Sequence, residues 1–188
     1  MDTKIRQNLI SEAKKRIAAD DPSHDFTHTQ RVLENALNIA KKEGGDLEII
    51  IPAALFHDLI TYPKNDPREK ISKVEQAILG TSPHGLKPTF LEAKIVQDAD
   101  LLEATGAIAI MRTFASSGKM NRPFYSPEGP FAQKRELDDL AYAVDLFYTR
   151  LLNADERMDT LAAKKIAKRR IKFLQQFLAE FQEELQGK

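Results

Sequence analysis

Two strong metal-binding side chains, His57 and Asp58, directly follow the apolar run from 49 to 56. Such a run favours burial, and burial is costly for an ionisable group that has no partner. His28 lies upstream and Asp100 downstream, each within another apolar segment. Two imidazoles and two carboxylates on three separate segments could therefore close around one cation.

The mixed nitrogen and oxygen donors of this set bear on the choice of metal. They suit Mn, Fe, Co, Ni or Zn better than Mg or Ca, which prefer oxygen ligands, but the pattern leaves the divalent metal ion undetermined and Mg among the candidates. Taken singly, each of the four residues is more often a hydrogen-bonded structural side chain. Taken together, they favour a metal site, because one divalent ion would neutralise both carboxylates and accept both imidazoles.

Composition excludes several classes of chemistry. The 188 residues include no cysteine, so a thiol nucleophile, a zinc-thiolate site and an iron-sulfur cluster are ruled out. Lys plus Arg and Asp plus Glu both number 28, so no net charge draws the protein to nucleic acid or to an anionic membrane. The basic residues between 164 and 172 are flanked by acids, which indicates a solvated helix face. Any affinity for phosphate must be local.

The beginning of the chain lacks the apolar core of a signal peptide, and no stretch approaches the roughly 20 apolar residues that span a bilayer. We therefore expect a cytoplasmic protein without a membrane partner. The sequence also lacks a glycine-rich phosphate loop and a Gly-x-Ser-x-Gly elbow, which argues against a P-loop NTPase, a Rossmann dehydrogenase and an α/β-hydrolase.

The elements that must position the four residues are predicted to be helices, because apolar residues recur at three- and four-residue steps and alternating strand patterns are scarce. Asp25 or Thr27, Asp46 and Thr89 are expected to cap helices. The predicted helices cover residues 5–17, 25–43, 52–59, 68–79, 90–100, 101–114, 137–152 and 161–185. Residues 116–131 are predicted to form a loop, whose aromatic residues anchor it to its own domain or stack on a ligand.

Three segments carry a resemblance to a known family. They are 23–32 (SHDFTHTQRV), 53–58 (AALFHD) and 91–100 (LEAKIVQDAD). In the order His28, His57-Asp58, Asp100, they resemble the HD-domain metal-dependent phosphohydrolase superfamily, and its small bacterial HD hydrolases in particular. The resemblance runs from about Ser23 to Phe177. It implies an all-α HD-domain helical bundle, here a single domain over 1–188, with core motifs in 23–115 and C-terminal helices in 134–186 packing on them.

The resemblance also implies roles for individual residues. His28, His57, Asp58 and Asp100 take the metal-ligand positions, and Asp58 could also orient water or accept a proton in catalysis. Lys64 and Arg112 are the basic residues expected at a substrate phosphate, and His84 could replace a histidine that relatives carry nearby. The implied substrate is a small phosphorylated metabolite, in particular a nucleotide, and a homodimer is compatible with the sequence.

Two departures from the family pattern keep a second hypothesis open. Where relatives often carry a His-Ser pair, this chain reads Thr81-Ser82. Relatives commonly read Arg-Leu-Asp after the last aspartate, whereas this chain reads Leu101-Leu102-Glu103. Glu103 lies one helical turn beyond Asp100, so it is expected either to face the same cleft or to be a surface acid. The leading hypothesis is hydrolysis of a phosphomonoester or phosphoanhydride by metal-activated water. The alternative is a degenerate HD protein that binds metal and nucleotide, or a protein partner, without turnover. A helical interaction module without metal is a third reading.

Overall fold

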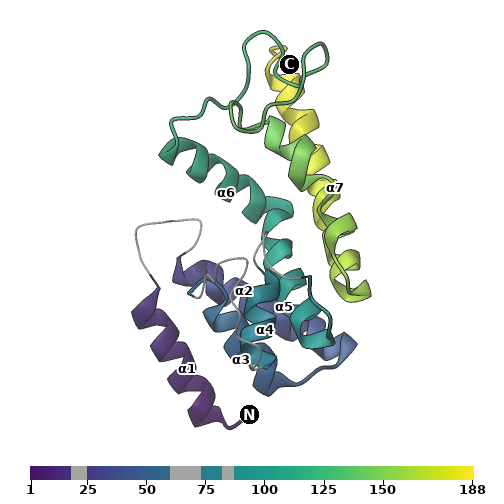
Figure 1. Ribbon diagram of the computed structural model, residues 1–188. Helices are drawn as coiled ribbons and strands as arrows, with labels where there is room; N and C mark the ends of the chain where they lie inside the picture. Colours follow the sequence, from purple (N-terminus) through teal and green to yellow (C-terminus); the bar gives the residue numbers. More distant parts are fainter. Residues whose placement is uncertain (18–24, 60–72, 82–86) are drawn as a thin grey trace. The chain divides into compact units, whose positions relative to one another are not determined.

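Seven α-helices and three shorter helical turns make up the regular structure in the computed structural model, which describes residues 1–17, 25–59, 73–81 and 87–188. These described residues contain no strand, which confirms the predicted all-α class. They group into two units, one formed by Met1–Leu102 with Met158–Ala163 and the other by Glu103–Arg157 with Lys164–Lys188. Figure 1 labels the α-helices in chain order.

The first unit holds five helices around one apolar core. They are α1 (Thr3–Arg16), α2 (Phe26–Glu43), α3 (Leu47–Phe56), α4 (Lys73–Thr81) and α5 (Leu91–Leu101). The helices α2, α3 and α5 pack against one another, α4 lies on α3 and α5, and α1 contacts α3 at the edge of the group (Figure 1). Val32 and Ile39 of α2 are fully buried in this core, as are Ile50 of α3 and Ile95 of α5.

Two helix beginnings follow from their capping residues. Asp25 and Asp46 each adopt an extended backbone and accept a hydrogen bond from the main chain of the first turn, as predicted. At α5 the predicted cap is wrong by one residue. Phe90 occupies the cap position with an extended backbone and makes no side-chain cap bond, so Thr89 lies outside the helix.

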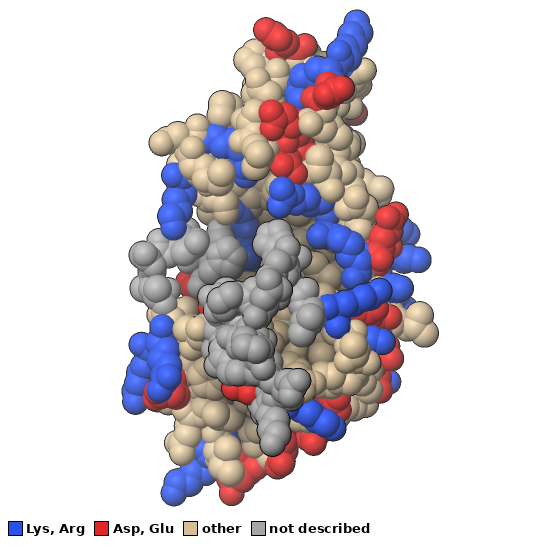
Figure 2. Space-filling view, viewed as in Figure 1, with Lys and Arg blue, Asp and Glu red and all other residues tan. Residues whose placement is uncertain are grey.

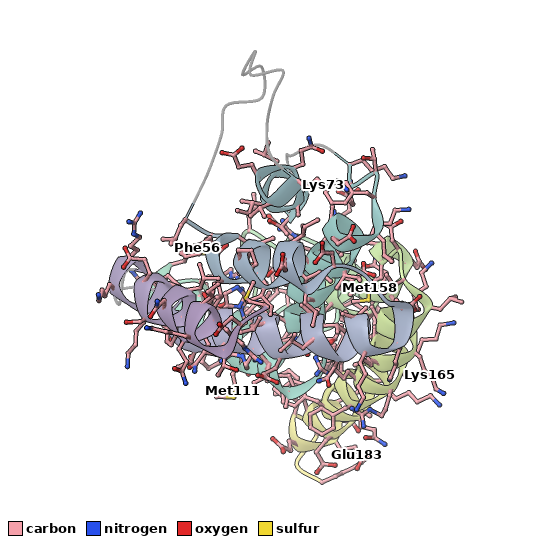
Figure 3. The ribbon with its side chains drawn as sticks, turned by 90° about the horizontal axis from the view of Figure 1, so that it is seen from below. Phe56, Lys73, Met111, Met158, Lys165 and Glu183 are labelled. Atoms are coloured by element: carbon pink, nitrogen blue, oxygen red, sulfur yellow. The ribbon has the colours of Figure 1, made fainter. Side chains whose placement is uncertain are left out.

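The helix α3 differs from its prediction because it runs unbroken from Leu47 and carries Pro52 in its interior. Proline there removes the hydrogen bond to the carbonyl of Glu48, four residues earlier. Glu48 is exposed, so water can satisfy its carbonyl and the helix continues. Figure 3 labels Phe56 at the end of this helix and Lys73 at the beginning of α4. The predicted helix over 68–79 lies partly outside the described residues, and its described part belongs to α4.

The second unit consists of α6 (Gly106–Lys119), a π-helical turn (Phe147–Leu151) and the part of α7 (Leu161–Glu184) that begins at Lys164. Short 3-10 turns at Leu102–Ala104 and Ala154–Arg157 lie near the unit boundaries. Its core contains Val144, Phe147, Leu174 and Leu178. Two ring pairs, Phe147 with Phe177 and Phe177 with Phe181, are stacked. The loop aromatics Tyr125 and Phe131 both contact the ring of Phe181, which confirms that they anchor the loop to its own unit.

Two predicted helices of this region are wrong. Residues 101–114 do not form one helix, because the chain breaks at Gly106, whose φ of +69° is accessible to glycine at little cost. Residues 137–152 do not form an α-helix either. Asp138 accepts hydrogen bonds from the next turn, and the N–H of Val144 donates to the carbonyl of Phe124. Side-chain and tertiary hydrogen bonds thus replace the helical ones.

Charges of both signs are interspersed over the face in Figure 2, which accords with a net charge of zero. Side chains on α6 and α7 such as Met111, Lys165 and Glu183 project outward in Figure 3. None of the described helices combines the length and apolar character that a bilayer-spanning segment needs.

Candidate metal centre

His28 lies in the first turn of α2, where the cap holds the backbone. The Asp25 carboxylate accepts hydrogen bonds from the N–H of His28 at 2.8 Å and from Thr27 Oγ1 at 2.6 Å. The His28 side chain is fully buried. A cap formed by a short acidic side chain therefore fixes the turn that carries the first candidate ligand.

His57 and Asp58 lie where α3 ends. His57 Nδ1 lies 2.9 Å from the carbonyl oxygen of Ala54, and a carbonyl can only accept, so Nδ1 carries the proton and donates it. In the neutral ring Nε2 is then the unprotonated nitrogen. A hydrogen bond of this kind fixes the tautomer and ring orientation that a metal-binding histidine requires.

The four candidate ligands converge within the first unit. The two Nε2 atoms of His28 and His57 are 3.2 Å apart, and Asp58 Oδ2 is 3.3 Å from each of them. Asp100 Oδ1 is 3.5 Å from His28 Nε2 and 3.7 Å from His57 Nε2. Ligands about 2.1 Å from a tetrahedral ion lie about 3.4 Å from one another. The observed spacings are close to that value. His28, His57 and Asp58 form a group that could hold a metal ion, and Asp100 borders the same space.

Electrostatics in the cluster favour a charged partner for the carboxylates. Burial opposes charge on His57, but the nearby carboxylates of Asp100 and Asp58 outweigh burial and raise the pKa of the imidazole. Burial likewise opposes charge on Asp100, yet His57 holds the pKa of that carboxyl below its usual value. Each group stabilises the charged form of the other. A divalent cation would take the place of the imidazole proton in this arrangement.

Arg112 and Glu103 both belong to the second unit, where they face each other. Arg112 Nη1 lies 4.0 Å from Glu103 Oε2, and the Glu103 side chain is 1% exposed. The expectation of a surface acid at Glu103 is therefore wrong, because the carboxylate is buried beside positive charge. The negative charge of Glu103 also acts on Arg170. Burial lowers the pKa of the Arg170 guanidinium, and the attraction to Glu103 opposes that change.

Two predicted substrate residues, Lys64 and His84, lie outside the described residues, so their roles stay predictions. The sequence assigns no role to Asp98, yet its side chain is fully buried. Burial raises the pKa of Asp98, while hydrogen bonds from Thr160 and Asp159 oppose the rise. The signal that could have identified it is a second carboxylate on the buried helix that carries Asp100.

The chain is similar to known proteins over most of its length. The family model of the HD domain matches residues 25–87. Over 195 aligned positions the chain is 31% identical to YpgQ, an uncharacterized protein of Bacillus subtilis strain 168, and the match covers 91% of this chain and 89% of that protein.

Two solved structures are similar over nearly the whole chain. The crystal structure of Bacillus subtilis YpgQ in complex with ADP matches with a TM-score of 0.75 at 28% identity, covering 96% of this chain and 95% of that one. A protein of Bacillus thuringiensis described as an HD-superfamily hydrolase matches with a TM-score of 0.76 at 29% identity, covering 98% of both chains. Sequence motifs, fold and relatives agree, and the chain belongs to the HD-domain superfamily.

Proposed function

We propose that this protein is a metal-dependent phosphohydrolase that acts on a small nucleotide or another phosphorylated metabolite. The observation that carries the proposal is the convergence of two imidazole nitrogens and two carboxylate oxygens at the spacing of ligands around one ion. The similarity to proteins described as HD-superfamily hydrolases supports the reaction class.

His28, His57, Asp58 and Asp100 would hold the cation in this proposal. When bound, a divalent ion supplies a Lewis acid for a phosphoryl oxygen and lowers the pKa of a coordinated water. Asp58 is the most exposed of the four, with a side chain 32% exposed, so solvent reaches it. It is assigned as a ligand first and as a group that orients the attacking water second, because a carboxylate on a divalent ion is a poorer base.

The nucleotide part of the proposal rests on a relative, since YpgQ of Bacillus subtilis has been crystallised with ADP. Phosphate recognition also needs cations besides the metal, because charge spreads over the phosphoryl oxygens during transfer. Lys64, Arg112 and His84 are proposed for this role from the sequence. The Glu103 partner of Arg112 restricts the directions in which the guanidinium can point.

The alternative of binding without turnover rests on Leu101 and on the histidine that is absent near Thr81. Leu101, half-buried at the end of α5, stands where relatives commonly carry arginine, directly after the candidate ligand Asp100. An apolar side chain there cannot donate to a phosphate oxygen. In this reading the cluster would still bind a cation, and a nucleotide or a protein partner would occupy the site unchanged.

The experiment that separates the two functions is a panel of nucleoside mono-, di- and triphosphates, each with Mn²⁺, Co²⁺, Mg²⁺ or Zn²⁺. Release of phosphate and of pyrophosphate is measured for the wild type, for Asp58→Ala and for a surface control, Glu156→Ala. We expect turnover in the wild type and in the control, and loss of turnover in Asp58→Ala. Cation and nucleotide binding without product in any combination would favour the alternative. Activity unchanged in Asp58→Ala would refute the proposed site.

A further inference from the structure

Asp98 shares the last two turns of α5 with Asp100 but faces elsewhere. Residues two positions apart on an α-helix differ by about 200° around the axis, so the side chains of Asp98 and Asp100 leave α5 on nearly opposite sides. Asp100 reaches the two histidines, whereas Asp98 reaches the segment from Met158 to Ala163.

Both oxygens of the Asp98 carboxylate are used by that segment. Oδ1 accepts a hydrogen bond from the N–H of Asp159 at 2.9 Å, and Oδ2 accepts from the N–H of Thr160 at 2.7 Å and from Thr160 Oγ1 at 2.6 Å. The Asp98 side chain is fully buried and Thr160 is 5% exposed. Hydrogen bonds to a buried carboxylate are stronger than neutral ones, so this contact is firm. The carboxylate of Asp98 thus acts here as the acceptor of three hydrogen bonds from this segment.

The partner segment is itself held in place. Thr160 Oγ1 accepts from the N–H of Ala163 in the first turn of α7, and Glu43 Oε1, at the end of α2, accepts from the N–H of Ala162 at 2.7 Å. Met158, labelled in Figure 3, is buried as well. The segment is thus a fixed support within the first unit, to which Asp98 attaches α5.

A second tie joins the same turn of α5 to α2. Asn35 Nδ2 donates to the carbonyl oxygen of Ala99 at 3.3 Å, one of the last carbonyls of α5, which lack helical partners. Asn35 follows His28 by seven residues, which is about two turns, so both lie on one face of α2. The α5 turn that carries Asp100 is therefore held from two directions, and helix ends without such ties fray.

We infer that Asp98 and Thr160 are positioning residues for the metal centre: their hydrogen bonds hold the last turn of α5 so that Asp100 reaches the cation shared with His28 and His57. The inference rests on the proposed metal site and adds to it a pair of residues that does not touch the cation. A displacement of Asp100 by less than an ångström would lengthen one coordination bond beyond the narrow range that metals accept.

The test uses Thr160→Val, which removes the hydroxyl that donates to Asp98 and accepts from the N–H of Ala163. The substitution keeps the side-chain shape and both backbone N–H groups that donate to Asp98. The matched control is Thr149→Val in the second unit, where Thr149 Oγ1 donates to Asp139 Oδ2 at the same 2.6 Å. Mn²⁺ affinity is measured by titration calorimetry on the full chain, with thermal unfolding of the same metal-free samples.

We expect Thr160→Val to weaken Mn²⁺ binding by about tenfold, the lower end of the range for groups that orient a metal ligand. Thr160→Ser, which restores the donor, should bind as the wild type, and Asp98→Asn should be at least as impaired as Thr160→Val. The Mn²⁺ affinity of Thr149→Val should stay within about twofold of the wild-type value, even if its melting temperature falls as much as that of Thr160→Val. That contrast distinguishes positioning from general destabilisation.

Two outcomes would overturn the inference in different ways. If Mn²⁺ binds the wild type but not Asp58→Ala, and Thr160→Val binds as tightly as Thr149→Val, the positioning role is wrong and the metal site remains. If the wild type binds no more Mn²⁺ than Asp58→Ala, the proposed metal site itself is wrong, and the inference fails with it.

Discussion

The Nε2 atoms of His28 and His57 lie 3.2 Å apart although 29 residues separate these histidines in the sequence. Two neutral imidazoles whose unprotonated nitrogens face each other repel, so the arrangement requires a proton or a cation between them. The carboxylates of Asp58 and Asp100 border the same space and add negative charge. This pairing is the feature from which the behaviour of the site follows.

Replacing either histidine by glutamine should abolish tight metal binding. His28→Gln and His57→Gln should each weaken Mn²⁺ affinity by more than about 100-fold, since losing a ligand costs more than losing a group that orients one. The double variant should be only slightly worse than either single one, because the residues act as a unit. Metal content after dialysis and calorimetric titration check this, and a single variant that retains its ion would contradict it.

Metal binding should stabilise the fold. At about 100 times the dissociation constant, Mn²⁺ adds about 2.7 kcal/mol to the free energy of unfolding. For a chain of this size that raises the melting temperature by about 5–10 °C, and a chelator should reverse the shift. Thermal unfolding of Asp58→Ala should show no shift with Mn²⁺. An equal shift in wild type and variant would indicate that the ion binds elsewhere.

Acid should weaken the second unit through Asp145. Its buried carboxylate accepts from Arg135 Nη1 at 2.5 Å and Nη2 at 2.7 Å. Burial would raise the pKa of Asp145, but Arg135 outweighs burial and holds it below the usual value. A lowered pKa means that the folded state favours the charged form, so the stabilisation is present above the unfolded-state pKa of about 3.9 and is lost as pH falls through the folded-state pKa.

The corresponding variant is Asp145→Asn. Its free energy of unfolding should be about 2–3 kcal/mol lower than that of the wild type at pH 7, less than for a fully buried pair because Arg135 is partly exposed. The gap between the two proteins should narrow below about pH 4. Urea unfolding at several pH values measures it. A gap that stays constant down to pH 2.5 would show that the charge of Asp145 contributes nothing.

Two glycines of α6 should respond in opposite directions to alanine. Gly106 has φ of +69°, and an added Cβ would lie 3.1 Å from the Cβ of Arg170. Gly106→Ala should cost about 1–2 kcal/mol from the left-handed backbone alone. Gly118 lies in the same helix with nothing within 4 Å of an added Cβ. Gly118→Ala should be neutral or stabilising by about 0.5 kcal/mol. Urea unfolding of both variants measures the difference, and equal effects would contradict the assignment of strain to Gly106.

Much of the first unit could be predicted because local signals agree there with tertiary packing. The apolar stripe of α2, its cap at Asp25 and Gly44 at its end all indicate the same helix, and the structure shows it. The grouping of His28, His57, Asp58 and Asp100 could be predicted as well, because four ionisable side chains on apolar segments need a shared partner. Long periodic segments such as α7 are predictable for the same reason.

The rest depends on partners far along the chain. The spacing of apolar residues in 137–152 predicts a helix. In the structure, Arg135 donates to the carboxylate of Asp145, and the N–H of Val144 donates to the carbonyl oxygen of Phe124 rather than to a helical neighbour. The break at Gly106 has no local signal other than the glycine itself. Asp98 stands out in the sequence only as a second carboxylate on a buried helix, and its partner Thr160 lies 62 residues further along the chain. Sequence periodicity carries no information on contacts of this range.

The support of Asp98 sets a limit on how the chain can be divided. All four candidate ligands lie within the first 100 residues. The N–H groups that donate hydrogen bonds to Asp98 belong to Asp159 and Thr160, which come much later in the chain. During synthesis the ligands therefore leave the ribosome well before α5 can be secured. A fragment that stops ahead of Met158 would contain all four candidate ligands and still lack the main chain to which Asp98 is hydrogen-bonded, so the first unit is not a contiguous stretch of sequence.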